Sequence, residues 1–178
     1  MKNIIFLLII ITITISACNT NHTQNNLTSR DSAIMNIQNL EHRLYGDSVQ
    51  VIKRGVAMET IIAYAKFAHN FPEDSLSPEF LFKAAEIARA LHNGKEAVLY
   101  YNMIYTDFPE NEKAPTALFL EAFTYENILK DTAQARILYQ NFIDKYPNNQ
   151  FADDARYSLK YLGKSAEELI KIFENNDH

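Results

Sequence analysis

An internal repeat between positions 78 and 147 constrains the fold of this chain more than any other feature. Residues 78–85 (PEFLFKAA) match residues 115–122 (PTALFLEA) at the proline, the Leu-Phe pair and the last alanine, with a shift of 37 positions. The shift then becomes 38 and pairs Ala97 with Ala135, Tyr101 with Tyr139, Phe108 with Tyr146 and Pro109 with Pro147. The added residue is expected in the turn, where 129–133 stand against 92–95. Self-similarity with a period of about 20 to 50 residues is typical of stacked-repeat folds.

Aromatic-proline pairs extend the pattern toward the N-terminus. They are Phe71-Pro72, Phe108-Pro109 and Tyr146-Pro147, and a tyrosine stands eight positions before each proline. Proline cannot continue a helix and disfavours the helical conformation of the residue before it, so each pair is predicted to end a helix. Because the chain holds only 4 glycines and 47% apolar residues, we expect helices throughout and a substantial core.

The predicted fold is an all-α array of antiparallel helix hairpins, an α-solenoid of about three repeats with flanking or capping helices. The folded domain is expected to span 31–178. Helices are expected near 31–45, 48–70, 78–92, 94–107, 115–129, 131–145, 151–162 and 165–174. The predicted caps are Asp31 and Ser77 at N-termini, capping boxes at 131–134 and 165–168, and Gly163 at a C-terminus.

The N-terminal residues resemble a bacterial lipoprotein signal. Lys2 precedes an apolar run at 4–15, and the run ends in Ile15-Ser16-Ala17-Cys18, which resembles a lipobox. The resemblance implies a signal peptide at 1–17, cleaved after Ala17, and lipid attachment at Cys18. Two or more acyl chains anchor a protein stably to a membrane. A plain secretory signal with a chance cysteine, or an uncleaved anchor, is the alternative.

A polar stretch follows the predicted lipid site. Residues 19–29 are almost without apolar side chains, so 18–30 is predicted to be a flexible tether. The residue after Cys18 is Asn19 and not Asp, which by resemblance to Gram-negative sorting rules favours the outer membrane, on its periplasmic side. A Gram-positive membrane remains the alternative.

The repeat resembles the tetratricopeptide pattern over residues 48–162. That pattern has small residues where the helices of a hairpin cross, an aromatic between hairpins, and proline after the second helix. The matching positions are Ala85, Ala97, Tyr101 and Pro109, and then Ala122, Ala135, Tyr139 and Pro147. The period of 37–38 exceeds the usual length of about 34 residues, the typical Trp is absent, and Thr60 stands where Ala97 would align.

Long repeats, aromatic-proline ends and a lipobox together resemble a narrower group. It contains the outer-membrane lipoproteins of the BamD kind, from the β-barrel assembly machinery, and the coordinator protein of the Tol–Pal system. Residues 151–157 (FADDARY) are similar to a helix opening found in that group. The resemblance implies a lipid-anchored periplasmic scaffold that binds a protein or peptide partner in envelope assembly or maintenance.

Patterns that carry catalytic chemistry are not evident in the sequence. The five histidines do not pair at helical spacing, and no glycine-rich phosphate loop or nucleophile elbow is found. The net charge of −5, without a basic cluster, argues against nucleic acid as a partner. We therefore expect no enzyme activity, no metal and no cofactor. The alternative is an envelope enzyme or an accessory ligand-binding subunit whose site is not visible in the sequence.

A partner is expected to bind the concave side, which the first helices of the hairpins line in such arrays. The candidate contact residues are Glu79, Phe82, Glu86, Arg89, Leu120, Thr124 and Asn127. Their mixed apolar and charged character fits a protein segment better than a small metabolite. For Phe82 and Leu120, a place in the core is the alternative.

Overall fold

Helices account for all of the regular structure in the computed structural model, which describes residues 21–46 and 53–176. The predicted signal peptide and the predicted lipid site at Cys18 lie outside the described residues. The helices are α1 (Asn21–Tyr45), α2 (Arg54–Asn70), α3 (Ser77–Ala90), α4 (Gly94–Asp107), α5 (Ala114–Thr124), the π-helix η1 (Tyr125–Leu129), α6 (Thr132–Lys145), α7 (Ala152–Tyr161) and α8 (Ala166–Asn176).

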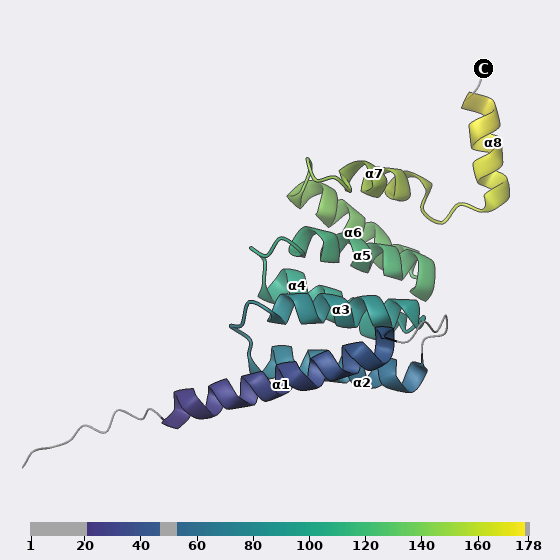
Figure 1. Ribbon diagram of the computed structural model, residues 1–178. Coiled ribbons are helices and arrows are strands. Elements are labelled where there is room, and N and C mark those ends of the chain that lie inside the picture. Colours follow the sequence, from purple (N-terminus) through teal and green to yellow (C-terminus); the bar gives the residue numbers. More distant parts are fainter. Residues whose placement is uncertain (1–20, 47–52, 177–178) are drawn as a thin grey trace, which may run out of the picture.

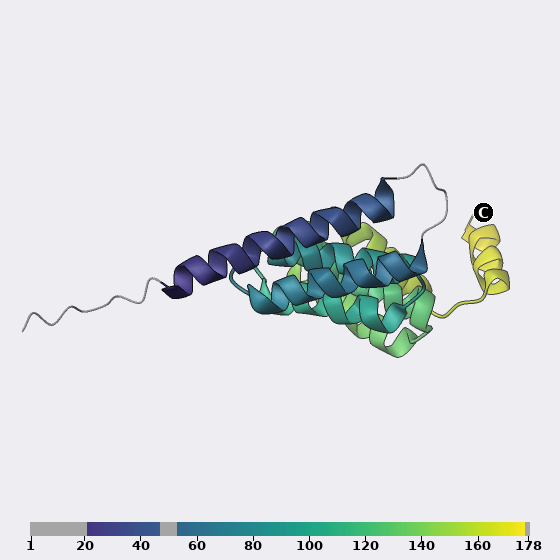
Figure 2. The same cartoon turned by 60° about the horizontal axis from the view of Figure 1, so that its bottom comes forward.

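The helices from α1 to α7 form a stack of hairpins in which each helix packs against the next (Figure 1). The first helices of the hairpins, α1, α3 and α5, form one layer, and α2, α4 and α6 form the other; Figure 2 shows the stack from a second direction. The predicted all-α solenoid is therefore confirmed. Among the described helices, α8 lies apart from the stack in both views, and none is long and apolar enough to cross a membrane.

The repeated alanines and aromatics have the places that the sequence predicts. Ala85, Ala97, Ala122 and Ala135 are fully buried, which lets the two helices of each hairpin approach closely. Aromatic rings fill the space between successive hairpins. Phe80 of α3 stacks on Tyr64 of α2, with 5.2 Å between ring centroids, and Phe151 at the start of α7 stacks on Phe119 of α5, with 4.9 Å between centroids. These contacts join the apolar faces that single hairpins would leave in water.

Each of the three aromatic-proline pairs is followed by a turn of the same geometry. Asp74, Asn111 and Asn149 each stand three residues after the aromatic, and their backbone N–H donates to its carbonyl at 3.0, 3.0 and 3.1 Å. The side-chain oxygen of each then accepts from the N–H two residues on, at 2.9, 3.0 and 3.0 Å. These Asx turns start α3, α5 and α7.

The predicted cap at Ser77 is therefore wrong. Ser77 is the first residue of α3, and its hydroxyl donates to Phe71 O at 2.6 Å, so it closes the turn from inside the helix. The predicted cap at Asp31 is also wrong, because Asp31 lies inside α1 (Asn21–Tyr45), but the other three are present. Asp131 accepts from Gln134 N at 3.0 Å, Ser165 and Glu168 bond reciprocally, and Gly163 has a φ of +81°.

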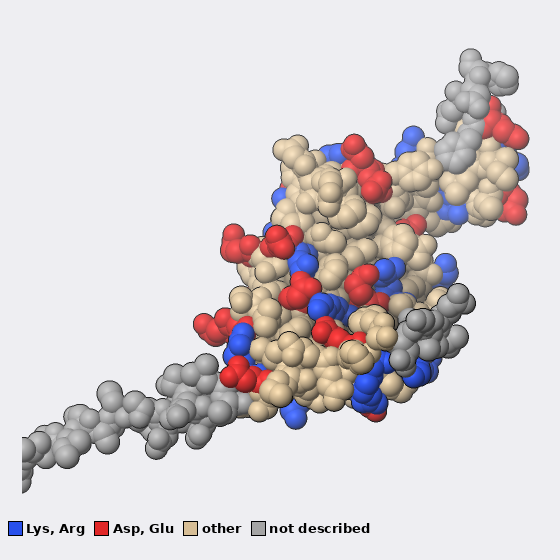
Figure 3. Space-filling view, in the orientation of Figure 1, with Lys and Arg blue, Asp and Glu red and all other residues tan. Residues whose placement is uncertain are grey.

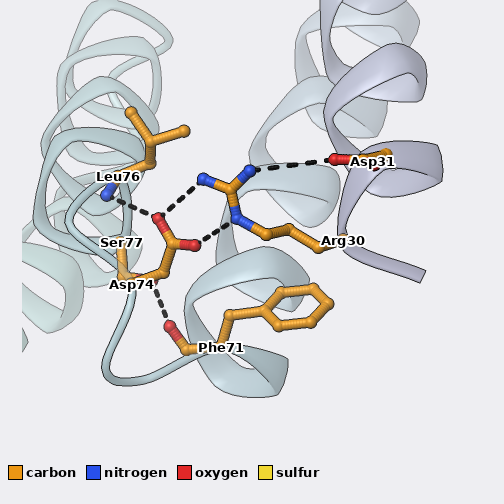
Figure 4. Close-up of polar contacts among 6 residues, drawn as sticks. All are labelled: Arg30, Asp31, Phe71, Asp74, Leu76 and Ser77. Atoms are coloured by element: carbon orange, nitrogen blue, oxygen red, sulfur yellow. Dashed lines mark hydrogen bonds and ion pairs between the residues drawn. The ribbon is translucent and has the colours of Figure 1, made fainter. Parts of the chain in front are cut away.

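α1 begins at Asn21, ten residues before the predicted cap at Asp31, so residues 21–30 of the predicted tether are helical. The end of this segment makes a contact that is distant in sequence. Arg30 forms an ion pair with Asp74 in the first Asx turn, with a second bond of 3.3 Å from Nη2, and also approaches Asp31 (Figure 4). The Arg30 guanidinium holds the pKa of Asp74 below its ordinary value. This ion pair joins α1 to the turn between α2 and α3.

The added residue of the second repeat lies in a helix and not in the predicted turn. His92 and Lys130 are both left-handed, with φ of 57° and 58°, and each precedes the N-cap of the next helix. Before them, α3 is regular, whereas α5 widens into η1 over five residues. A π-turn takes up one extra residue without breaking the helix. The change in the shift between repeats, from 37 to 38 positions, is therefore located at η1.

Candidate partner-binding surface

The predicted contact residues on α3 lie on one face of that helix, because Glu79, Phe82, Glu86 and Arg89 follow at steps of three and four. All four are half-buried, so each presents part of its side chain to solvent and part to the stack. The structure thus brings this part of the predicted set together.

Glu86 is the centre of the polar contacts at the C-terminal end of α3. Arg89 donates to it from Nε at 3.2 Å and from Nη2 at 2.9 Å, and the hydroxyl of Tyr101 on α4 donates to the same carboxylate. Burial opposes ionisation of Glu86, but the hydrogen bonds from Arg89 and Tyr101 outweigh it and lower the pKa of its carboxyl. Burial and the same contact raise the pKa of the Tyr101 hydroxyl. The cluster is a fixed ionic group with a half-exposed edge.

Glu79 and Phe82 are linked to the next hairpin by Lys113. The ammonium of Lys113 lies 2.9 Å from Glu79 Oε2 and 5.0 Å from the centre of the Phe82 ring. Phe82 also packs edge-on against Tyr101, with 6.0 Å between ring centroids. Phe82 thus combines core packing with partial exposure, and its contact with a partner stays a prediction.

The same layer carries an ionic group on α1. Lys83 of α3 lies 2.8 Å from Glu41 Oε1, and the hydroxyl of Tyr64 donates to the same oxygen at 2.6 Å. In the third hairpin, Tyr139 donates to Glu126 at 2.7 Å. The tyrosine eight positions before each proline therefore anchors a glutamate from the first helix of its own hairpin. The repeated tyrosines were visible in the sequence, but their acceptors were not, because Glu41, Glu86 and Glu126 do not share one repeat position.

These groups form a mixed surface that we call the A-helix surface, made of Glu41, Glu79, Phe82, Lys83, Glu86, Arg89 and Lys113. Figure 3 views the layer that contains α1, α3 and α5, and it shows acidic and basic side chains interspersed over the middle of that layer. Sequence reasoning missed Glu41, Lys83 and Lys113. The sequence shows that these three residues are charged, but it does not show that they lie beside the predicted set in the stack.

The predicted residues on the next hairpin differ from this group. Thr124 is fully buried, and its hydroxyl donates to Leu120 O at 2.7 Å, so its prediction as a contact residue is wrong. A threonine that satisfies its hydroxyl within its own helix can be buried at little cost. Leu120 is half-buried and packs against both core clusters. Asn127 is exposed in η1, where its amide donates to Phe123 O at 3.1 Å.

Within residues 21–46 and 53–176, no group of three or more His, Cys, Asp or Glu side chains is arranged to hold a metal ion. The predicted surface contains carboxylates, but each of Glu41, Glu79 and Glu86 is already paired with a Lys or Arg. What the arrangement offers a partner is an aromatic edge among fixed charges of both signs.

Comparison with known families identifies one of the hairpins. Residues 116–149 match the family model of the tetratricopeptide repeat. The match covers most of α5, η1, α6 and the third aromatic-proline turn, and the predicted tetratricopeptide repeat is confirmed there. No curated protein matches the chain. A tetratricopeptide repeat within a solenoid indicates a scaffold for protein–protein interaction.

Proposed function

We propose that this protein is a non-catalytic, lipid-anchored scaffold on the periplasmic side of the outer membrane. It is held by acyl chains on Cys18 and recruits a protein partner for envelope assembly or maintenance. Two features of the sequence support this location: the lipobox ending at Cys18, and the resemblance to BamD-type and Tol–Pal coordinator lipoproteins. The tetratricopeptide match supports the scaffold role.

The A-helix surface is the proposed place of contact, and Phe82 carries that argument. Aromatic side chains supply large contact areas at protein interfaces, and those at the centre of a patch contribute most to affinity. Phe82 is half-exposed between Lys113 and the Glu86–Arg89 pair. Because these charges are held by contacts within the stack, little side-chain entropy is lost when a partner covers them.

Replacing Cys18 with Ala should abolish lipid attachment and leave the precursor unprocessed, because the acyl chains are attached to the cysteine sulfur. The measurement is metabolic labelling with a fatty acid, together with membrane fractionation and the size of the mature chain. A matched Ser16→Ala variant keeps a small residue before the cysteine and should be processed as the wild type is. Unchanged labelling and processing in Cys18→Ala would refute the anchor.

A photoreactive amino acid at Phe82 or at Leu120 should crosslink to a protein partner in intact cells, with the product identified by mass spectrometry. The same group at Ile62 is the control, because Ile62 is 59% exposed on α2, in the other helix layer. We expect a specific product from Phe82 and not from Ile62. Equal crosslinking from both positions, or none from Phe82, would contradict the proposed surface.

A further inference from the structure

A buried carboxyl group, Glu121 of α5, takes no part in the surface described above. Its side chain is only 4% exposed, and its Oε2 atom has no hydrogen-bond partner among the described residues. The position that corresponds to it in the preceding hairpin is Ala84, which is fully buried. The stack therefore does not require a carboxylate at this position. An orphaned buried acceptor is unfavourable, and more so when it is charged, so its presence needs an explanation.

Glu121 forms part of the wall of an open groove of about 370 Å³. The groove lies where α4, α5, η1 and α6 meet, and its other lining residues are Lys95, Val98, Leu99, Asn102, Tyr125 and Gln134. Tyr125 is the first residue of η1, so the π-turn contributes directly to the lining. Single π-turns within α-helices occur frequently at functional sites.

We propose that this groove binds the side chain of an arginine from a protein partner, with the guanidinium paired to the Glu121 carboxylate. The site goes beyond the A-helix surface, since α4 and α6 belong to the other helix layer. It rests on the proposed function only in taking the ligand to be part of a protein.

The lining fits an arginine side chain along its length. Val98 and Leu99 give apolar contact for the three methylene groups, and Leu99 is 55% exposed and free to cover them. A planar guanidinium can stack on the half-buried ring of Tyr125. A lysine ammonium is not planar and stacks on a ring less well. The Glu121 carboxylate then receives a charge-assisted hydrogen bond.

Charged and titratable groups around Glu121 come from two packed elements. Tyr105 and Lys95 belong to α4, Tyr125 belongs to η1, and the α6 residue in the lining, Gln134, is neutral. Lys95 is exposed, where water screens its charge. Burial raises the pKa of Glu121 to about 7, and the polar side chains of Tyr105 and Asn102 work in the opposite direction. A bound cation favours the ionised form, so binding should strengthen by about tenfold from pH 6 to pH 8.

The test is an NMR titration of the full-length chain in detergent micelles with N-acetyl-arginine N-methylamide at pH 8. The amides of residues lining the groove should shift in a saturable way. N-acetyl-citrulline N-methylamide has nearly the same shape without the charge, and it should bind at least about tenfold more weakly. The lysine analogue should also bind more weakly than the arginine compound. Because the probe is added to isolated protein, the result is independent of Cys18 and of crosslinking at Phe82.

Two variants show whether the carboxyl group is responsible. Glu121→Gln keeps the shape and should weaken binding of the arginine compound by at least about tenfold. Glu121→Ala, which copies the alanine at position 84, gives a second variant if the amide disturbs folding. Glu110→Gln removes the same charge from an exposed turn position and should bind as the wild type does. No saturable shift, equal binding of arginine and citrulline, tighter binding of lysine, or equal binding by Glu121→Gln and Glu110→Gln would overturn the proposal.

Discussion

Replacing Phe142 with Ala should lower the free energy of unfolding by about 3–5 kcal/mol, the range for removing a fully buried aromatic side chain. Phe142 is completely buried on α6. Its ring lies 5.6 Å from that of Phe119 on α5 and 5.7 Å from that of Tyr146. The substitution leaves a cavity between α5, α6 and the third turn, and the surrounding helices can collapse into it only in part. Urea denaturation followed by circular dichroism measures the loss.

The matched control is Ile137→Ala in the same helix, where the side chain is 62% exposed. An exposed substitution usually changes stability by less than about 0.5 kcal/mol. Hydrogen exchange adds a second readout, because stability in a repeat array is local to neighbouring units. Protection should fall more in α5, α6 and α7 than in α2 and α3. Equal losses for the two variants would show that α6 does not carry the core as described.

The parts of the fold that follow from local and periodic signals were predictable from the sequence. Helix α4 begins at Gly94 and ends at Asp107, as predicted, because an Asn-Gly break and a Phe-Pro pair stand at its ends. The crossing alanines and the tyrosines before each proline were identified from the repeat alone. On the A-helix surface, helical periodicity alone was sufficient to place Glu79, Phe82, Glu86 and Arg89 on one face of α3.

The parts that depend on contacts distant in sequence were not predictable. The contact of α1 with the first Asx turn is one case, since Arg30 and its partner Asp74 stand 44 positions apart in the sequence. The place of the added residue is another. A Cβ atom at Gly94 would lie 2.8 Å from Ile128 Cγ2 and 2.9 Å from Leu129 Cδ2, so η1 packs tightly on this glycine. That packing is a tertiary effect, which the repeat pattern in the sequence does not reveal.

Replacing Glu121 with Gln should raise the free energy of unfolding at pH 8 by about 3 kcal/mol and change it little at pH 4. Burial raises the pKa of Glu121 from 4.5 to about 7 in the folded protein. Between these values the folded state binds the proton more tightly than the unfolded state. Its contribution to stability therefore falls as the pH rises from about 4.5 to about 7, and the full loss is present above that window.

The measurement is urea denaturation of the two proteins at a series of pH values, because their difference isolates Glu121 from carboxyl groups such as Glu86 and Asp74. Those two groups have lowered pKa values, so their contribution to the free energy of unfolding falls toward acid pH in both proteins. Glu110→Gln is again the control, since its side chain is exposed in the folded protein, and it should follow the wild-type curve. A Glu121→Gln curve parallel to the wild type would show that the carboxyl group is not held in an unfavourable environment. The predicted gain would instead mean that the stack gives up stability to keep an acid at the groove, which is the pattern expected when a residue is retained for binding.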